Sequence, residues 1–404
     1  MTNGIYTYLQ WSTEEKEERG LVYTAKEIAQ QPNVWQDTTD RITQGLAEWR
    51  GWMSNAGLYA TNKPQVILSG AGSSYYVALC TQPLWRKTYG SRCEAWPTTR
   101  IIVEPTALLA RNEPIILVSF ARSGQNPESI GSVRLVDQIA SDSHHIAITC
   151  NKESYLGRLQ ESNPDARSLV LHPDTLDKGL AMTSSFTSLV LAGLLLASID
   201  NHEQARAIAS NLTRLGERLL DNSGQLLDLV SRHNFARSFI LGDGSQYGVA
   251  LEGVLKLAEF TDGRMLGIAN SFLAARHGEA NAIDDDTLVV FLLASDSYLR
   301  AYQTEVLQEL CTRRPKATRV AVTLHKDDSL GEYVDHLVVL DEDGEVFIPD
   351  EWRAPIDTLV LQCVALQRSL DLGIRPDQPF SHRATLKAVD GMKLIPFTEK
   401  ERGR

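Results

Sequence analysis

The chain has 404 residues, 43% of them hydrophobic, and a formal net charge of −11. That length allows two or three domains with cores of their own, and the acidic balance argues against a nucleic-acid scaffold, which would show a basic patch. The N-terminus lacks a basic region followed by an apolar run, and no apolar stretch reaches the roughly 20 residues of a membrane helix. The sequence therefore predicts neither a signal peptide nor a membrane span.

The five cysteines are scattered and form no C-x-x-C pair, which excludes a disulfide framework and a zinc site of the usual spacing. Reduced thiols in a cytoplasmic protein are the simplest interpretation. We expect no nucleic-acid partner and no membrane partner.

The first fifty residues have the pattern of polar helices, with Thr13 as a candidate N-cap before three glutamates. After Pro64, short apolar runs alternate with amphipathic segments. Such alternation predicts a mostly parallel sheet covered by helices on both faces. The predicted strands are 66–68, 115–120, 146–149 and 169–171, and the predicted helices include 74–87 and 127–139.

The same pattern then repeats. The run 67–72 resembles 240–244, and 146–149 resembles 320–323, at an offset of about 170 residues that indicates duplicated domains rather than a solenoid. The second set of predicted strands is 239–241, 288–293, 320–323 and 337–340. We expect an N-terminal helical segment (1–45), a first domain (46–215), a second domain (216–370) and a C-terminal tail (371–404). Each domain is predicted to be an α/β three-layer sandwich of the flavodoxin-like or Rossmann-like kind.

Three polar turns stand at strand-to-helix passages of the first domain. The first is Ser69-Gly70-Ala71-Gly72-Ser73-Ser74-Tyr75, the second is Ser119–Ser129, and the third is Thr183-Ser184-Ser185. Glycines with hydroxyl residues at a helix start form an anion site, because amide N–H groups and the helix dipole favour negative charge. A tight structural turn is an equally good interpretation of any one of them. Three together favour a phosphate. Neither the dinucleotide spacing nor a P-loop is present.

In the second domain, Glu252, Lys256 and Glu259 share one face of a predicted helix. A surface ion-pair ladder is the alternative interpretation, and such ladders contribute little to stability. His277 follows in Arg276-His277-Gly278. No second histidine stands near it at a metal spacing, so we expect no metal site.

These residues resemble those of tandem sugar isomerase (SIS) domain proteins, in particular the AgaS group of galactosamine-6-phosphate deaminase/isomerases. The isomerase half of glucosamine-6-phosphate synthase is a more distant relative. The resemblance extends over nearly the whole chain. It includes Trp11–Glu15, Pro97–Thr99, Ser119–Gly124, Ile148–Asn151 and Ala181–Ser185.

The resemblance implies roles for individual residues. Phosphate would be held by Gly72, Ser73 and Ser74 of the first turn and by Arg122, Ser123 and Asn126 of the second, with Thr183 and Lys256 lining the same pocket. Glu259 would move the proton between C1 and C2. His277 would open the sugar ring and would come from the neighbouring subunit of a homodimer. A C-terminal catalytic lysine falls on Lys387, with Arg383 as its rival.

Two positions depart from the family pattern. Glu279 stands where a proline commonly follows His-Gly, and Ala121 replaces a hydroxyl of the second turn. Neither departure removes a catalytic group. The expected reaction is deamination with isomerisation of galactosamine 6-phosphate to tagatose 6-phosphate and ammonia, without a metal or organic cofactor. A plain aldose–ketose isomerase and a non-catalytic sugar-phosphate sensor remain as alternatives.

Overall fold

The computed structural model describes residues 4–380 and 392–398. The chain begins with helices that end before the first strand. The N-cap of the second helix is Ser12, whose hydroxyl accepts a hydrogen bond from the Glu15 amide at 3.1 Å, so the cap lies one residue before the predicted Thr13. These helices are α1 (Tyr6–Leu9), α2 (Thr13–Arg19), α3 (Thr24–Ala29), α4 (Gln31–Gln44) and α5 (Leu46–Asn55).

Five parallel strands then form the first sheet in the order β2-β1-β3-β4-β5. This is the flavodoxin-like order, and the direction of winding reverses between β1 and β3. The strands are β1 (Gln65–Gly70), β2 (Cys93–Pro97), β3 (Pro114–Ala121), β4 (Asp142–Thr149) and β5 (Ala166–Val170). The helices of this half are α6 (Ser73–Tyr89), α7 (Thr98–Val103), α8 (Pro105–Leu108), α9 (Pro127–Ile139), α10 (Leu159–Ser162) and α11 (Ser184–Ala197).

The second sheet has the order β10-β9-β8-β6-β7. Read from β7, this is the same topology as that of the first sheet. Its strands are β6 (Arg237–Leu241), β7 (Leu266–Asn270), β8 (Thr287–Leu292), β9 (Thr318–His325) and β10 (His336–Asp341). The helices are α12 (His202–Asn222), α13 (Gly224–Arg232), α14 (Ser245–Phe260), α15 (Phe272–Ala275), α16 (Ser297–Arg313) and α17 (Ala354–Asp371). Two parallel α/β sheets, the predicted fold class, are thereby confirmed.

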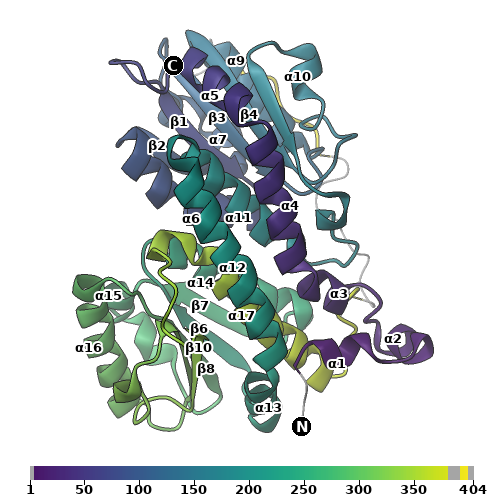
Figure 1. Cartoon of the computed structure of the whole chain (residues 1–404), viewed down its shortest axis with the longest axis vertical. Coiled ribbons are helices and arrows are strands. Elements are labelled where there is room, and N and C mark those ends of the chain that lie inside the picture. Colours follow the sequence, from purple (N-terminus) through teal and green to yellow (C-terminus); the bar gives the residue numbers. More distant parts are fainter. Residues whose placement is uncertain (1–3, 381–391, 399–404) are drawn as a thin grey trace.

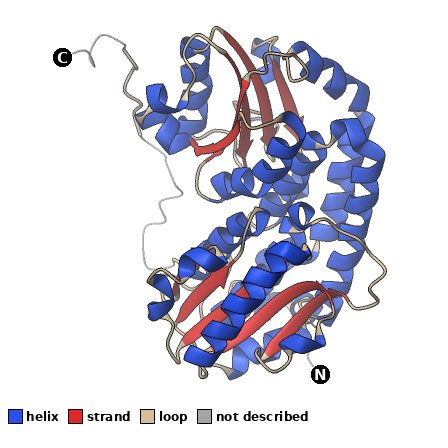
Figure 2. Ribbon diagram, turned by 90° about the vertical axis from the view of Figure 1, so that its left-hand side faces the viewer, coloured by secondary structure: helices blue, strands red, loops and turns tan. Residues whose placement is uncertain are grey.

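One layer of helices lies between the two sheets (Figures 1 and 2). Side chains alternate along each strand: Val66 and Leu68 join the core shared with these inner helices, whereas Ile67 faces α7 and α9 on the outside. In the second sheet, Ile240 points into the same shared core, and Phe239 packs against α15 and α16. The inner layer of α6, α11, α14 and α17 therefore belongs to both halves.

The expected domain boundary at 215/216 falls inside α12, which is a single continuous helix from His202 to Asn222. No single helix in residues 4–380 and 392–398 is long and apolar enough to cross a membrane. One pair, Ser184–Ala197 with Ile199–Asn222, meets the length and composition test only as two segments bent by 84°. The first of these helices is buried along its whole length.

Candidate active site

The turn after β1 is open to a ligand. Gly72 has φ 57° and ψ −129°, a conformation that favours glycine, and nothing lies within 4 Å of where a side chain would begin. It leads into α6, a helix of 17 residues with no side-chain cap at its N-terminus. Ser73 and Ser74 are each 6% exposed at that end. An uncapped helix start with inward hydroxyls is suited to a phosphate.

The turn after β3 lies beside the first one, because Ser69 and Ser119 are paired in the sheet. It thus stands at the point where the winding reverses, which is where open α/β sheets bind ligands. Ser123 is exposed there. Asn126 caps α9 by accepting a hydrogen bond from the Ser129 amide at 3.0 Å. Arg122 donates to the Leu180 carbonyl at 3.0 Å, so its guanidinium is tied to the loop before the third turn.

The third turn is a closed structure. Thr183 is fully buried, and its hydroxyl donates to the Asp177 carboxylate at 3.0 Å. Asp177 also accepts the amides of Thr183, Ser184 and Ser185, so a carboxylate of the chain itself occupies the start of α11. The neighbouring Met182 approaches the Ser74 hydroxyl at 4.0 Å. The third turn therefore borders the first, with the Thr183 hydroxyl already engaged.

Helix α14 brings the predicted acid–base residues to the same place. Lys256 and Glu252 are both fully buried, with Nζ and Oε1 3.3 Å apart, and Lys256 also donates to the Glu259 carboxylate. The side chain of Glu259 is 27% exposed, so it can meet a ligand. The interpretation of this face as a surface ladder is wrong, because Glu252 and Lys256 are completely buried.

The first turn and α14 meet at Glu252. The Ser73 hydroxyl approaches that carboxylate closely enough to lower its pKa, although neither carboxylate oxygen has a well-aligned hydrogen bond. The buried Glu252 carboxylate of the second half thus stands next to the glycine turn of the first half.

The pKa of Glu252 is raised to about 7, mainly by burial. The Lys256 ammonium opposes this shift, and the Glu259 carboxylate adds to it. Burial disfavours the charged form of Lys256, but its two carboxylate neighbours outweigh that effect and raise its pKa. Lys256 is therefore a permanent buried cation, whereas Glu252 changes charge near neutral pH.

His277 lies elsewhere in its own chain. It follows α15, whose Phe272 and Ala275 pack on the outer face of the second sheet, whereas α14 lies on the inner face. The carboxyl end of β7 is joined to the start of α14, since the Gly242 amide donates to the Asn270 carbonyl at 3.1 Å. Glu259 is at the other end of that helix, about 20 Å away for a rise of about 1.5 Å per residue. His277 itself is exposed.

Lys387 and its rival Arg383 lie outside the described residues. The described segments on either side are both anchored. Asp377 accepts hydrogen bonds from the Val22, Tyr23 and Thr24 amides at the start of α3. Beyond the gap, the Phe397 carbonyl accepts a hydrogen bond from Gln138 of α9 at 3.2 Å. The tail therefore contacts both the N-terminal helices and the first domain.

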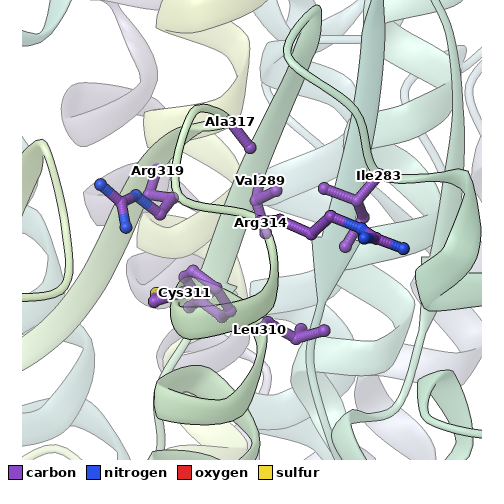
Figure 3. Close-up of a pocket in the computed structure, with 8 residues that line it drawn as sticks. Ile283, Val289, Leu310, Cys311, Arg314, Ala317 and Arg319 are labelled. Atoms are coloured by element: carbon purple, nitrogen blue, oxygen red, sulfur yellow. The ribbon is translucent and has the colours of Figure 1, made fainter.

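A small cavity in the second half fits a ligand less well. Figure 3 shows a cavity at the amino ends of β8 and β9, lined by residues that include Ile283, Val289, Cys311 and Arg314. Its volume is about 10 Å³, room for about one water molecule and not for a sugar phosphate. Within residues 4–380 and 392–398, no group of three or more His, Cys, Asp or Glu side chains is arranged to hold a metal ion.

Comparisons with known proteins show the family of the chain. The family model of the SIS domain matches residues 233–370. A proposed D-galactosamine-6-phosphate deaminase AgaS from Streptomyces coelicolor is 33% identical over 379 residues, covering 92% of this chain and 95% of that protein. This chain belongs to the AgaS family. The D-galactosamine-6-phosphate deaminase AgaS of Shewanella sp. (strain ANA-3) is another AgaS relative, 30% identical over 96% of this chain and 95% of its own length.

The AgaS fold is also found among solved structures. A proposed tagatose-6-phosphate ketose/aldose isomerase from Clostridium novyi superposes with a TM-score of 0.91 at 29% identity, covering 98% of this chain and all of that one. A more distant relative, the glutamine–fructose-6-phosphate aminotransferase of Escherichia coli, is 24% identical over 88% of this chain. The predicted relationship to tandem SIS proteins is confirmed, and with it a sugar-phosphate enzyme of the isomerase or deaminase kind.

Sequence reasoning missed one carboxylate near the site, Asp177, and the complete burial of another, Glu252. Asp177 stands in a loop and has no motif of its own, so its role at the third turn is visible only in the fold. Glu252 was on the predicted helix face, but its complete burial depends on α6, which is nearly 180 residues earlier in the chain.

Proposed function

We propose that this protein converts galactosamine 6-phosphate and water to tagatose 6-phosphate and ammonia in the cytoplasm, as a homodimer without a metal or organic cofactor. The observation that supports this most directly is the buried Glu252–Lys256–Glu259 group beside the open turn of Ser73. A phosphate site and a half-exposed carboxylate next to a buried cation are what proton transfer on a sugar phosphate requires.

The phosphate would rest on the amides of the first and second turns, with Gly72, Ser73, Ser74 and Ser123 around it. His277 would assist ring opening by moving a proton from the C1 hydroxyl to the ring oxygen. Glu259 would take the proton from C2, which the neighbouring C1 carbonyl makes acidic, and return it at C1. The resulting C2 imine would add water and release ammonia. Lys256 would stabilise the negative charge that develops in between.

We further propose that His277 acts on the site of the neighbouring subunit. Within one chain it follows a helix on the outer face of the second sheet, and Glu259 projects from a helix on the inner face. Exposure of His277 suits a contact with a second copy. Lys387, which lies outside the described residues, would supply the C-terminal catalytic lysine in this proposal, with Arg383 as its rival.

An aldose–ketose isomerase acting on an unaminated sugar phosphate is the second candidate. The name of the Clostridium novyi relative favours it, and the same base and phosphate turns would serve. Incubation with galactosamine 6-phosphate, glucosamine 6-phosphate and tagatose 6-phosphate distinguishes the two. Ammonia from an amino sugar supports the deaminase. Isomerisation of tagatose 6-phosphate without ammonia from either amino sugar would support the isomerase instead.

A further inference from the structure

Lys256 lies between two carboxylates that differ in their access to a ligand. Glu259 is 27% exposed at its side chain, and Glu252, about two helical turns earlier, is completely buried. Only Glu259 can contact a substrate. Glu252 is nevertheless close enough to the ammonium to compete for it, at 3.3 Å.

The surroundings of Glu252 contain few other charges. On α14 it faces Lys256 and Glu259, and on α6 it faces Ser73, Tyr76 and the thiol of Cys80. From α17 the nearest ionisable group in this region is Asp357, which is paired with Arg353 at 2.9 Å. Both carboxylate oxygens of Glu252 lack a well-aligned hydrogen bond. Among these neighbours, Lys256 is therefore the group that can balance the negative charge of ionised Glu252.

We propose that Glu252 is a positioning residue whose ionised carboxylate draws Lys256 away from Glu259 and so leaves Glu259 free to accept the substrate's proton. The proposal rests on the proposed function, because it concerns the base of that reaction. When Glu252 is neutral, the Lys256 ammonium has one carboxylate to satisfy it, and Glu259 is held in a charge-assisted hydrogen bond. A carboxylate in such a bond is a weaker base.

Ionisation of Glu252 changes this balance. The group of three then carries one net negative charge, and the ammonium is shared between two acceptors. Because burial raises the pKa of Glu252 to about 7, the change falls in the neutral range. Turnover should increase as the pH rises through that value.

The test is the pH profile of Glu252→Gln, which keeps the shape of the side chain but cannot ionise. Product formation and deuterium incorporation from solvent are followed on the same sugar phosphate from pH 5.5 to 9. We expect wild type to lose activity below about pH 7 and the variant to be reduced about 10-fold to 100-fold at pH 8, as for a misplaced catalytic group. The variant should also lose the acid limb.

Two further variants keep the result interpretable. Glu27→Gln removes another buried carboxyl whose pKa is raised to about 7, but one that accepts the Lys178 and Gly179 amides instead of an ammonium. It should retain the acid limb. Glu252→Asp keeps an ionisable group and should shift the midpoint, which also covers the case in which the glutamine variant does not fold.

An acid limb with an unchanged midpoint in Glu252→Gln, or in Glu252→Asp if only that variant folds, would overturn the inference whatever the rate. The proposed function fails separately. Wild type that neither converts nor exchanges any of the sugar phosphates refutes both, whereas active wild type with an unchanged variant profile refutes only the role of Glu252.

Discussion

The two halves of the molecule use the same frame for different purposes. Gly72 and Gly244 open the corresponding helices with nearly identical backbones, φ 57° and ψ −129° against φ 58° and ψ −126°. The second turns differ. Ser123 is exposed after β3, whereas after β8 the amides of Ser295 and Asp296 are bound by the Asp350 carboxylate at 2.8–2.9 Å. In the second half these amides are bound by a carboxylate of the chain itself, whereas in the first half we propose that they bind the phosphate.

The comparison shows how a duplicated fold can divide its work. The corresponding turn of the second half is filled by Asp350, and that half contributes α14, whose Glu252 contacts Ser73 in the first turn of the first half. In the proposed function, a ligand site in one half and a base in the other would make one active site from two copies of a domain. The following experiments test that division, in order of decreasing effect.

Glu259→Gln should reduce turnover by about 10²–10⁴ while sugar-phosphate binding persists, because it removes the general base and not the phosphate turns. Lys87 is the counterpart in the first half, because it follows Ser73 by as many residues as Glu259 follows Ser245. It forms an exposed ion pair with Glu351 at 2.6 Å. Lys87→Gln should leave turnover unchanged. Ammonia release and binding calorimetry measure the two effects. Turnover of Glu259→Gln within threefold of wild type would remove Glu259 from its role.

Mixing Glu259→Gln with His277→Ala should restore activity that neither variant has alone. In a twofold dimer with shared sites, about half of randomly mixed dimers are heterodimers with one intact site each, so recovery to about a quarter of wild type is expected. Co-expression with two affinity tags isolates the heterodimer. If purified heterodimers remain as inactive as the parents, His277 acts within its own chain or has no part in the reaction.

Ser73→Ala combined with Ser123→Ala should weaken binding of sugar phosphates by tens-fold or more, since a hydrogen bond to a charged group contributes about 1.5–3 kcal/mol. The matched control is Ser245→Ala with Ser295→Ala, at the corresponding turns of the second half. Calorimetric titration with galactosamine 6-phosphate should show unchanged affinity for the control. Equal losses in both pairs would contradict the division of work between the halves.

Asp350→Ala should destabilise the protein by about 0.5–1.5 kcal/mol, because it removes the partly exposed carboxylate that accepts the Ser295 and Asp296 amides, and water can take its place. Affinity for sugar phosphate in the first half should not change. Urea unfolding and calorimetry give the two quantities. A variant as stable as wild type would show that the carboxylate in the second turn is incidental.

Glu27→Gln should alter the pH dependence of stability. Burial, with the nearby Asp177 carboxylate, raises the pKa of Glu27 from 4.5 to about 7. The folded state then binds the proton more tightly than the unfolded state, so the contribution of Glu27 to stability is complete below about pH 4.5 and is lost as the pH rises toward 7. The urea concentration at the midpoint of unfolding should fall less steeply with increasing pH, between pH 5 and 8, in the variant than in wild type. Parallel curves for variant and wild type would refute the expectation.

Much of the fold could be predicted from the sequence because its central strands are continuous apolar runs. The two strands that were missed, β2 and β7, are edge strands. In β7 the residues Leu266 to Asn270 are half-exposed and include Gly267, so burial imposes no clear pattern on them. The turn at Gly72 could also be predicted from the sequence, since its backbone conformation at positive φ favours glycine.

The arrangement of the site was less predictable. Helical spacing placed Glu252, Lys256 and Glu259 on one face, but not the burial that changes their acid–base behaviour, because α6 and α17 supply that burial from distant parts of the chain. The same applies to Thr183, whose partner Asp177 has no sequence signal. Which face of the second sheet carries His277 follows from the packing of Phe272 and Ala275.

The helix layer between the sheets has a consequence for how the molecule unfolds. Strand residues such as Val66 and Ile240 and helix residues such as Leu191 and Leu361 belong to one continuous core, and α12 runs unbroken across the junction of the halves. Neither half keeps its inner surface covered without the other. The chain should therefore melt in a single calorimetric transition, and either half expressed alone should aggregate rather than fold, although the sequence records two domains.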